Sequence, residues 1–155
     1  MKRPLVIGLG HRYRGDDGVG PRVVDELRSL YPVLAEYRES QGDAAELLDL
    51  FEGREAVILI DAVCKAEDEA GKIYRLDGLN DSLPVQDGIS SSHVLSLSEA
   101  LQLGRILDRL PGTLVIYGIN GANFDPGDQL SGPVAGCTRE VIEAVVARLN
   151  QMFRR

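Results

Sequence analysis

The stretch LVIGLGHRYRGDDGVG at residues 5–20 constrains the fold of this chain more than any other. It opens with a short apolar run that ends on Gly8 and Gly10, a pattern typical of a buried strand entering a tight loop. Apolar residues then recur with a 3.6-residue period up to Leu30, so we expect a helix beginning near Gly18. A strand, a glycine loop and a helix in this order place the loop at the carboxyl edge of a sheet, where open α/β folds keep their binding sites.

The glycine pair also invites comparison with the dinucleotide-binding loop, Gly-x-Gly-x-x-Gly. Tyr13 stands where the third glycine should be. The carboxylates of Asp16 and Asp17 would repel a pyrophosphate, and Glu39, near the end of the second expected strand, is a poor substitute for the rest of the pattern. The sequence therefore argues against a nucleotide-binding module.

Asp17 fits two roles. Its side chain can cap the helix by accepting a backbone N–H two or three residues further on, and spacing alone favours this role. The helix amides and the helix dipole also favour an ionised carboxylate, which is the form that a metal ion requires. The two roles are compatible, so Asp17 is a candidate for both.

Size and composition limit the possible functions. The 155 residues are 44% hydrophobic and 26% charged, which predicts a single domain over residues 1–155 with one core. The N-terminal apolar stretch is too short for a signal peptide and no run reaches membrane-spanning length, so we expect a cytoplasmic protein. The net charge of −7 argues against nucleic acid and anionic membranes as partners.

Strands and helices alternate along the rest of the chain. Further strands are expected at residues 34–38, 56–60, 71–76 and 113–119, with helices over residues 44–51, from about residue 92, and from residue 131. The runs at 56–60 and 113–119 are apolar throughout, which predicts strands buried on both faces. The fold class is therefore α/β, with a mostly parallel sheet covered on both faces and a candidate edge strand at 71–76.

Asp61 directly follows the apolar run at 56–60. A carboxylate at the carboxyl end of a central strand lies where the first glycine loop also opens, so Asp61 and Asp17 are expected to converge. Position alone equally allows Asp61 to be a loop residue that caps or turns. Cys64 is a candidate nucleophile, although a cysteine at such a position more often packs.

His93 stands at the head of an expected helix, after three serines. A histidine in a first helical turn is pushed toward the neutral form, which ligates metals, but alone it is more often a surface or capping residue. Ser131 is expected to cap the final helix. Cys137 falls on the apolar stripe of that helix and is interpreted as a core residue.

Asp17, Asp61 and His93 belong to three segments that can meet at one sheet edge. Mixed nitrogen and oxygen ligation of this kind suits nickel, zinc or a similar divalent ion, with positions left open for water or substrate. Because only the spacing of these residues in the sequence supports it, the metal site is a hypothesis.

The chain resembles the hydrogenase maturation proteases, which are endopeptidases that remove the C-terminal extension from the large subunit of nickel-iron hydrogenases. The matching motifs are Gly8-Leu-Gly10, Gly15-Asp-Asp17-Gly-Val-Gly20-Pro21, Ile60-Asp61-Ala62, His93 at the head of its helix, and Gly118-Ile119 leading to Leu130-Ser131. The resemblance implies a three-layer α/β/α sandwich with a twisted, mostly parallel five-stranded sheet.

The resemblance also implies a metal-binding site formed by Asp17, Asp61 and His93. Its partner would be the C-terminal region of the large-subunit precursor, and the nickel recognised would be the one already loaded in that substrate. Other divalent ions are expected to occupy the same site in vitro. The three residues are thus candidate metal contacts and candidate catalytic residues, and the attack comes from one of them or from a metal-bound water.

Two features depart from the family pattern. His11 stands where the family usually has Asn, and is either a fourth ligand or a loop hydrogen-bonder. The turn SQGD at residues 40–43 stands where the family usually has Asp-x-Gly-Thr. This difference bears on which precursor is cut. Two alternatives stay open: a non-proteolytic maturation module that binds the nickel subunit without cutting it, and a small-molecule hydrolase that uses Cys64 with His93.

Overall fold

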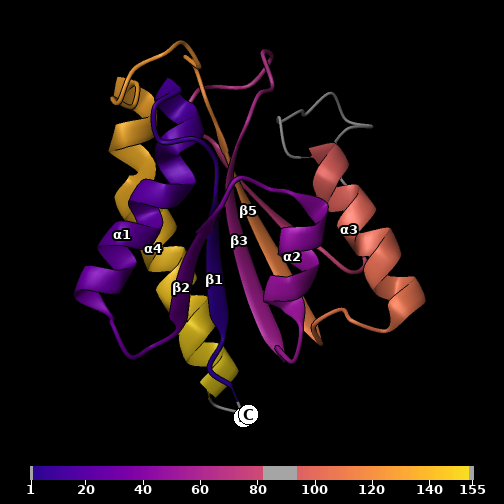
Figure 1. The fold of residues 1–155 in the computed structure, drawn as a ribbon. Helices are drawn as coiled ribbons and strands as arrows, with labels where there is room; N and C mark the ends of the chain where they lie inside the picture. Colours follow the sequence, from indigo (N-terminus) through magenta and orange to yellow (C-terminus); the bar gives the residue numbers. More distant parts are fainter. Residues whose placement is uncertain (1, 82–93, 154–155) are drawn as a thin grey trace.

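The computed structural model describes residues 2–81 and 94–153 (Figure 1). Its elements in chain order are β1 (Leu5–Leu9), the 3-10 turn η1 (Gly15–Gly18), α1 (Val19–Leu30), β2 (Glu36–Ser40), α2 (Ala44–Phe51), β3 (Ala56–Val63), β4 (Ile73–Asp77), α3 (Val94–Leu107), β5 (Thr113–Asn120) and α4 (Gly132–Phe153). The predicted alternation of strands and helices is confirmed. His93 lies outside the described residues.

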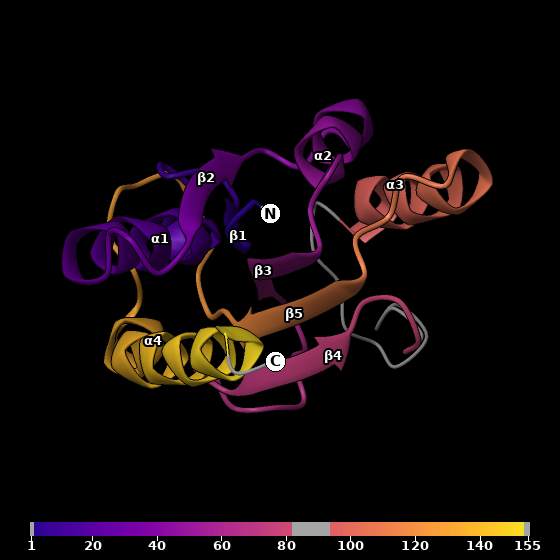
Figure 2. The ribbon, with the colours of Figure 1, turned by 90° about the horizontal axis from the view of Figure 1, so that it is seen from below.

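The strands form one sheet in the order β2-β1-β3-β5-β4. Neighbouring strands run parallel except for β4, which pairs antiparallel with β5 at the edge. Helices α1 and α4 cover one face of the sheet, and α2 and α3 cover the other, as the two views in Figures 1 and 2 show. The predicted three-layer α/β/α sandwich with a mostly parallel, five-stranded sheet is therefore confirmed.

The core is divided by the sheet into two apolar clusters. The cluster beneath α1 and α4 takes Ile58, Ile60 and Ala62 from β3, and the cluster beneath α2 and α3 takes Val57 and Leu59. Side chains alternate between the two faces along a strand. Asp61 therefore belongs to the face that α2 and α3 cover.

Several strand boundaries differ from the sequence prediction, and the structure explains those of β2 and β3. β2 begins at Glu36 instead of residue 34, because residues 32–34 form a turn and the Glu36 N–H is the first to reach across, donating to the Pro4 carbonyl at 2.9 Å. β3 continues to Val63, so Asp61 lies within the strand and not after it. The extension is explained by β5, which runs alongside and pairs Gly118 with Asp61.

Helix α4 is amphipathic along its 22 residues. Its buried stripe includes Val134, Val141 and Val145, and Cys137 is 8% exposed among them, which confirms it as a core residue. Within residues 2–81 and 94–153, no helix is both long enough and apolar enough to span a bilayer.

The start of α1 is pressed against the sheet without intervening side chains. A Cβ atom on Gly20 would lie 2.5 Å from the carbonyl oxygen of Ile60 and 2.6 Å from that of Leu9. A Cβ atom on Gly8 would lie 2.5 Å from the carbonyl oxygen of Gly20. Glycine at both positions therefore lets the helix backbone touch β1 and β3, and this contact sets where the preceding loop sits.

Replacing Gly20 by alanine should lower the free energy of unfolding by about 2 kcal/mol, because the added methyl group overlaps backbone oxygens that cannot move aside. Urea denaturation measures the change. Gly136→Ala on α4 is the matched control, since nothing lies within 4 Å of its added Cβ atom. That variant should gain about 1 kcal/mol from helix propensity, and equal effects of the two substitutions would contradict the close-contact explanation.

Candidate functional site

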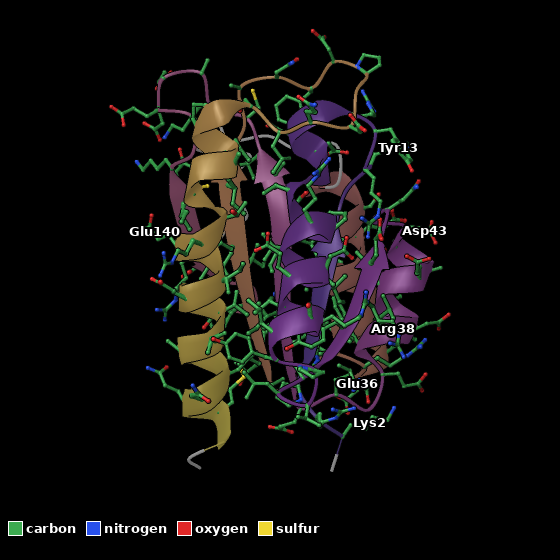
Figure 3. All side chains as sticks on the ribbon, turned by 90° about the vertical axis from the view of Figure 1, so that its left-hand side faces the viewer. Lys2, Tyr13, Glu36, Arg38, Asp43 and Glu140 are labelled. Carbon is green, nitrogen blue, oxygen red and sulfur yellow. The ribbon has the colours of Figure 1, made fainter. Side chains whose placement is uncertain are left out.

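The carboxyl ends of β1, β3 and β5 lie at one edge of the sheet, and the loops over residues 10–14, 64–72 and 121–131 follow them there. Helix α3 leads into the amino end of β5, so its first residue, Val94, lies at this same edge. Figure 3 shows Tyr13 near this end of the molecule and Lys2 and Glu36 at the opposite end. This edge of the sheet is therefore the candidate site.

Asp17 lies in the 3-10 turn η1 and is 5% exposed. Its Oδ2 atom accepts a hydrogen bond of 2.8 Å from the backbone N–H of His11. The residue that caps α1 is Gly18, and no side chain caps the helix. The predicted capping role of Asp17 is therefore wrong, because the 3-10 turn places one residue between Asp17 and the helix and its carboxylate turns back to the glycine loop.

Asp61 is also 5% exposed. The pairing of Gly8 with Ile60 places Asp61 one residue further along β3, level with the end of β1. A Cβ atom on Gly10, just beyond that end, would lie 3.6 Å from Cγ of Asp17. The fold thus brings two nearly buried carboxylates, one from η1 and one from β3 and 44 positions apart in the sequence, to the same end of the sheet.

His93, the third predicted ligand, lies outside the described residues, so the metal site of Asp17, Asp61 and His93 stays a prediction. In the part of the chain that is described, no group of three or more His, Cys, Asp or Glu side chains is arranged to hold a metal ion. His11 uses its ring Nδ1 to accept a hydrogen bond of 3.3 Å from the N–H of Tyr13, which supports its interpretation as a loop hydrogen-bonder. Cys64 is an exposed free thiol directly after β3.

Asp16 is the residue at this edge that the sequence analysis did not select as functional. It is fully buried, and its carboxylate accepts three backbone N–H bonds, from Ala122 at 2.7 Å, Asn123 at 2.9 Å and Ser131 at 2.7 Å. The Ser131 hydroxyl donates a fourth bond at 2.8 Å. Ser131 does precede α4, and its carbonyl accepts a hydrogen bond of 2.8 Å from the N–H of Ala135, so it stands at the start of the helix as predicted.

Burial alone would raise the pKa of Asp16, because a charged group is poorly solvated there. The three backbone amides and the Ser131 hydroxyl outweigh burial, so the pKa of Asp16 lies below its ordinary value. Asp16 is therefore a fixed anion that ties η1 to the loop between β5 and α4.

Backbone hydrogen bonds extend this connection. The N–H of Gly15 donates to the carbonyl of Gly127 at 3.0 Å, and the N–H of Gly127 donates to Tyr13 at 2.9 Å. Gly15 has φ of 57°, and a Cβ atom there would lie 2.4 Å from the carbonyl oxygen of Asn123. Hydrogen bonds from residues 13–16 therefore join the loop over residues 121–131 at several points along its length.

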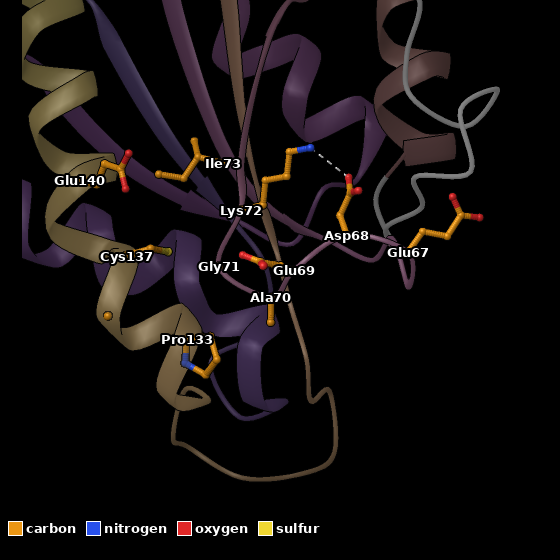
Figure 4. A pocket seen from close by; sticks show the side chains of 11 residues that line it. Glu67, Asp68, Glu69, Ala70, Gly71, Lys72, Ile73, Pro133, Cys137 and Glu140 are labelled. Carbon is orange, nitrogen blue, oxygen red and sulfur yellow. Dashed lines mark hydrogen bonds and ion pairs between the residues drawn. The ribbon is translucent and has the colours of Figure 1, made fainter.

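A groove of about 750 Å³ opens at the same edge, between the loop after β3 and the first turns of α4 (Figure 4). Four carboxylates line it, Glu67, Asp68, Glu69 and Glu140, together with apolar residues that include Ile73, Pro133 and Cys137. Lys72 pairs with Asp68 at 3.2 Å. Burial and the nearby Glu140 raise the pKa of the Cys137 thiol, which makes it a poor nucleophile.

Comparisons with known proteins agree on one family. A family model described as hydrogenase maturation protease matches residues 42–148. The hydrogenase 2 maturation protease of Escherichia coli (strain K12) is 28% identical over 153 residues, which covers 96% of this chain and 92% of that protein.

Solved structures agree as well. The hydrogenase 2 maturation peptidase of Thaumarchaeota archaeon SCGC_AB-539-E09 is 31% identical and matches with a TM-score of 0.68 over 96% of this chain and 98% of its own. The maturating endopeptidase HybD of E. coli has the same fold, with a TM-score of 0.81 at 24% identity over 97% of this chain and 93% of its own. Since the family model covers more than half of the sequence, the chain belongs to the hydrogenase maturation protease family.

Proposed function

We propose that this protein is an endopeptidase that removes the C-terminal extension of a nickel-iron hydrogenase large-subunit precursor after nickel has been inserted. Family membership supports the reaction class. The observation that carries the proposal is the pair of carboxylates, Asp17 and Asp61, each 5% exposed at one sheet edge. Carboxylates buried at one end of a sheet are uncommon in protein interiors and are a frequent feature of functional sites.

In this proposal the two carboxylates and the imidazole of His93 contact the nickel that the substrate carries. Carboxylate oxygen and imidazole nitrogen are ligands that divalent nickel accepts. The N–H of His11 fixes one oxygen of Asp17, which leaves its second oxygen for the metal. Contact with the loaded nickel would orient the precursor, so that only a metal-containing substrate presents its scissile bond.

Hydrolysis then requires water to attack the carbonyl carbon of the scissile peptide bond. A carboxylate that takes one proton from this water and passes it to the leaving nitrogen completes the reaction, and either Asp17 or Asp61 suits that role. The groove beside α4 opens at the same end of the sheet and offers a surface along which polypeptide flanking the cleavage site can lie. Its carboxylates favour neutral or basic segments over acidic ones.

Intact-mass analysis of a large-subunit precursor from the source organism tests the proposal. The nickel-loaded precursor should lose its C-terminal segment when incubated with this protein, whereas the nickel-free precursor should keep its full mass. Cleavage of both forms would show a peptidase without nickel recognition. Binding of the loaded precursor without any change in mass would favour the non-proteolytic maturation module.

The same assay separates the thiol hydrolase alternative. Cys64→Ser and alkylation of the exposed Cys64 thiol should leave the rate of precursor cleavage unchanged, because the proposed reaction uses carboxylates. A loss of cleavage in both preparations would transfer the catalytic role to Cys64.

A further inference from the structure

Arg12 makes the densest set of charged contacts among the described residues. Its Nη1 and Nη2 atoms bind the two carboxylate oxygens of Asp25 on α1, at 2.7 and 2.9 Å. Its Nε and Nη2 atoms bind the two oxygens of Glu39 on β2, at 2.9 and 2.8 Å. One planar guanidinium thus holds two carboxylates in bidentate geometry, which gives orientation as well as attraction.

These contacts fix the loop that supports Asp17. Arg12 directly follows His11, whose N–H binds the Asp17 carboxylate. The backbone of Arg12 also packs on η1, since a Cβ atom on Gly18 would lie 3.2 Å from the Arg12 carbonyl oxygen. The side chain of Arg12 therefore anchors the loop from one side, and Asp16 anchors it from the other.

The Arg12 contacts also connect the glycine loop with the turn after β2. His11 is the neighbour of Arg12, and Glu39 immediately precedes the turn at residues 40–43. The N–H of Gly10 donates to the carbonyl of Ser40 at 3.0 Å, so the glycine loop and this turn touch directly. The loop and the turn are therefore held together by this backbone bond and by the Arg12 ion pair to Glu39.

We propose that Arg12 is a positioning residue, which holds the His11 amide against Asp17 and so keeps that carboxylate aimed at the substrate's metal. The inference rests on the proposed function and assigns no contact between Arg12 and the substrate. If Arg12 only stabilised the fold, its replacement would change the turnover of the precursor little. The side chains of Arg12, Asp25 and Glu39 are 35%, 44% and 36% exposed, and ion pairs this exposed contribute little to stability.

The test compares Arg12→Ala and Arg12→Lys with the control Arg139→Ala, which removes a 90% exposed arginine that pairs with Glu143 on α4. Arg12→Ala should lower kcat for cleavage of nickel-loaded precursor roughly tenfold or more, with KM and the urea midpoint nearly unchanged. Arg12→Lys should not restore kcat, because an ammonium group cannot bind both carboxylates in bidentate fashion. Added ethylguanidinium should restore part of the activity of Arg12→Ala.

Hydrogen exchange of the His11 amide provides a readout that needs no cleavage. In Arg12→Ala this amide should exchange roughly tenfold faster, whereas Arg139→Ala should leave it unchanged. Unchanged exchange and unchanged kcat in Arg12→Ala would overturn the positioning role. If the wild-type protein cleaves no precursor, the proposed function fails, and faster His11 exchange would still support the effect of Arg12 on the loop.

Discussion

Replacement of Asp16 by alanine is expected to lower the free energy of unfolding by about 3 kcal/mol. The variant removes the acceptor for three backbone amides and one hydroxyl, all of which converge on a fully buried carboxylate. Hydrogen bonds to a charged group are the stronger ones in proteins. Urea denaturation at neutral pH, followed by circular dichroism, measures the loss.

Two further substitutions make the explanation testable. Asp16→Asn should cost about 2 kcal/mol, because the amide NH2 group would face backbone N–H donors that need an acceptor. Ser131→Ala should cost only about 1 kcal/mol, since it removes one of the four bonds and keeps the charge. Equal effects for Asp16→Ala and Ser131→Ala would show that the carboxylate itself contributes little.

The contribution of Asp16 should also depend on pH in a defined direction. The pKa of Asp16 is lowered in the folded protein, so ionised Asp16 stabilises the fold at every pH above the unfolded value of about 3.9. This stabilisation is lost as the pH falls below that value and through the lower folded pKa. The stability difference between wild type and Asp16→Asn should therefore be constant from neutral pH down to about pH 5 and shrink below pH 4.

Asp17→Asn should reduce the rate of precursor cleavage roughly a thousandfold and leave the fold intact. The amide oxygen of asparagine can still accept the hydrogen bond from the His11 N–H, so the loop keeps its support. The substitution removes only the negative charge, which the proposed function needs for the metal and for proton transfer. Asp61→Asn should have a similar effect on cleavage.

The matched control is Asp128→Asn, an exposed carboxylate in the loop before α4 that belongs to neither anchor. It should retain the wild-type rate, although it changes the net charge of the same sheet edge by the same amount. Single-turnover assays by intact mass, together with free energies of unfolding from urea denaturation within about 0.5 kcal/mol of wild type, provide the measurement. Full activity of both Asp17→Asn and Asp61→Asn would remove the carboxylate pair from the mechanism.

Sequence patterns were sufficient where the signal is local. The apolar runs and the helical period predicted β1, α2 and the core of β3 and β5, and glycine spacing predicted the loop that carries Asp17. These features depend on neighbouring residues, whose pattern of burial can be read directly. The position of Asp61 near the carboxyl edge was predicted for the same reason, although the strand extends two residues beyond it.

Interactions between distant segments left no comparable signal. The partners of Asp16 lie 106 to 115 positions away in the sequence, and those of Arg12 lie 13 and 27 positions away. Neither residue belongs to a short pattern that specifies its partner, so only the folded structure shows what each one holds. The capping role predicted for Asp17 was wrong for a related reason, because the 3-10 turn that displaces it depends on contacts with residues 123 and 127.

The two edges of the sheet determine how a polypeptide substrate can be recognised. Both edge strands, β2 and β4, have five residues, and their exposed side chains are charged: Arg38 and Glu39 on one, Arg75 and Asp77 on the other. Short, charged edges resist the addition of a further strand. Under the proposed function, a precursor tail is therefore not read through its backbone as a sixth strand, and is selected by its side chains and its metal at the end of the sheet.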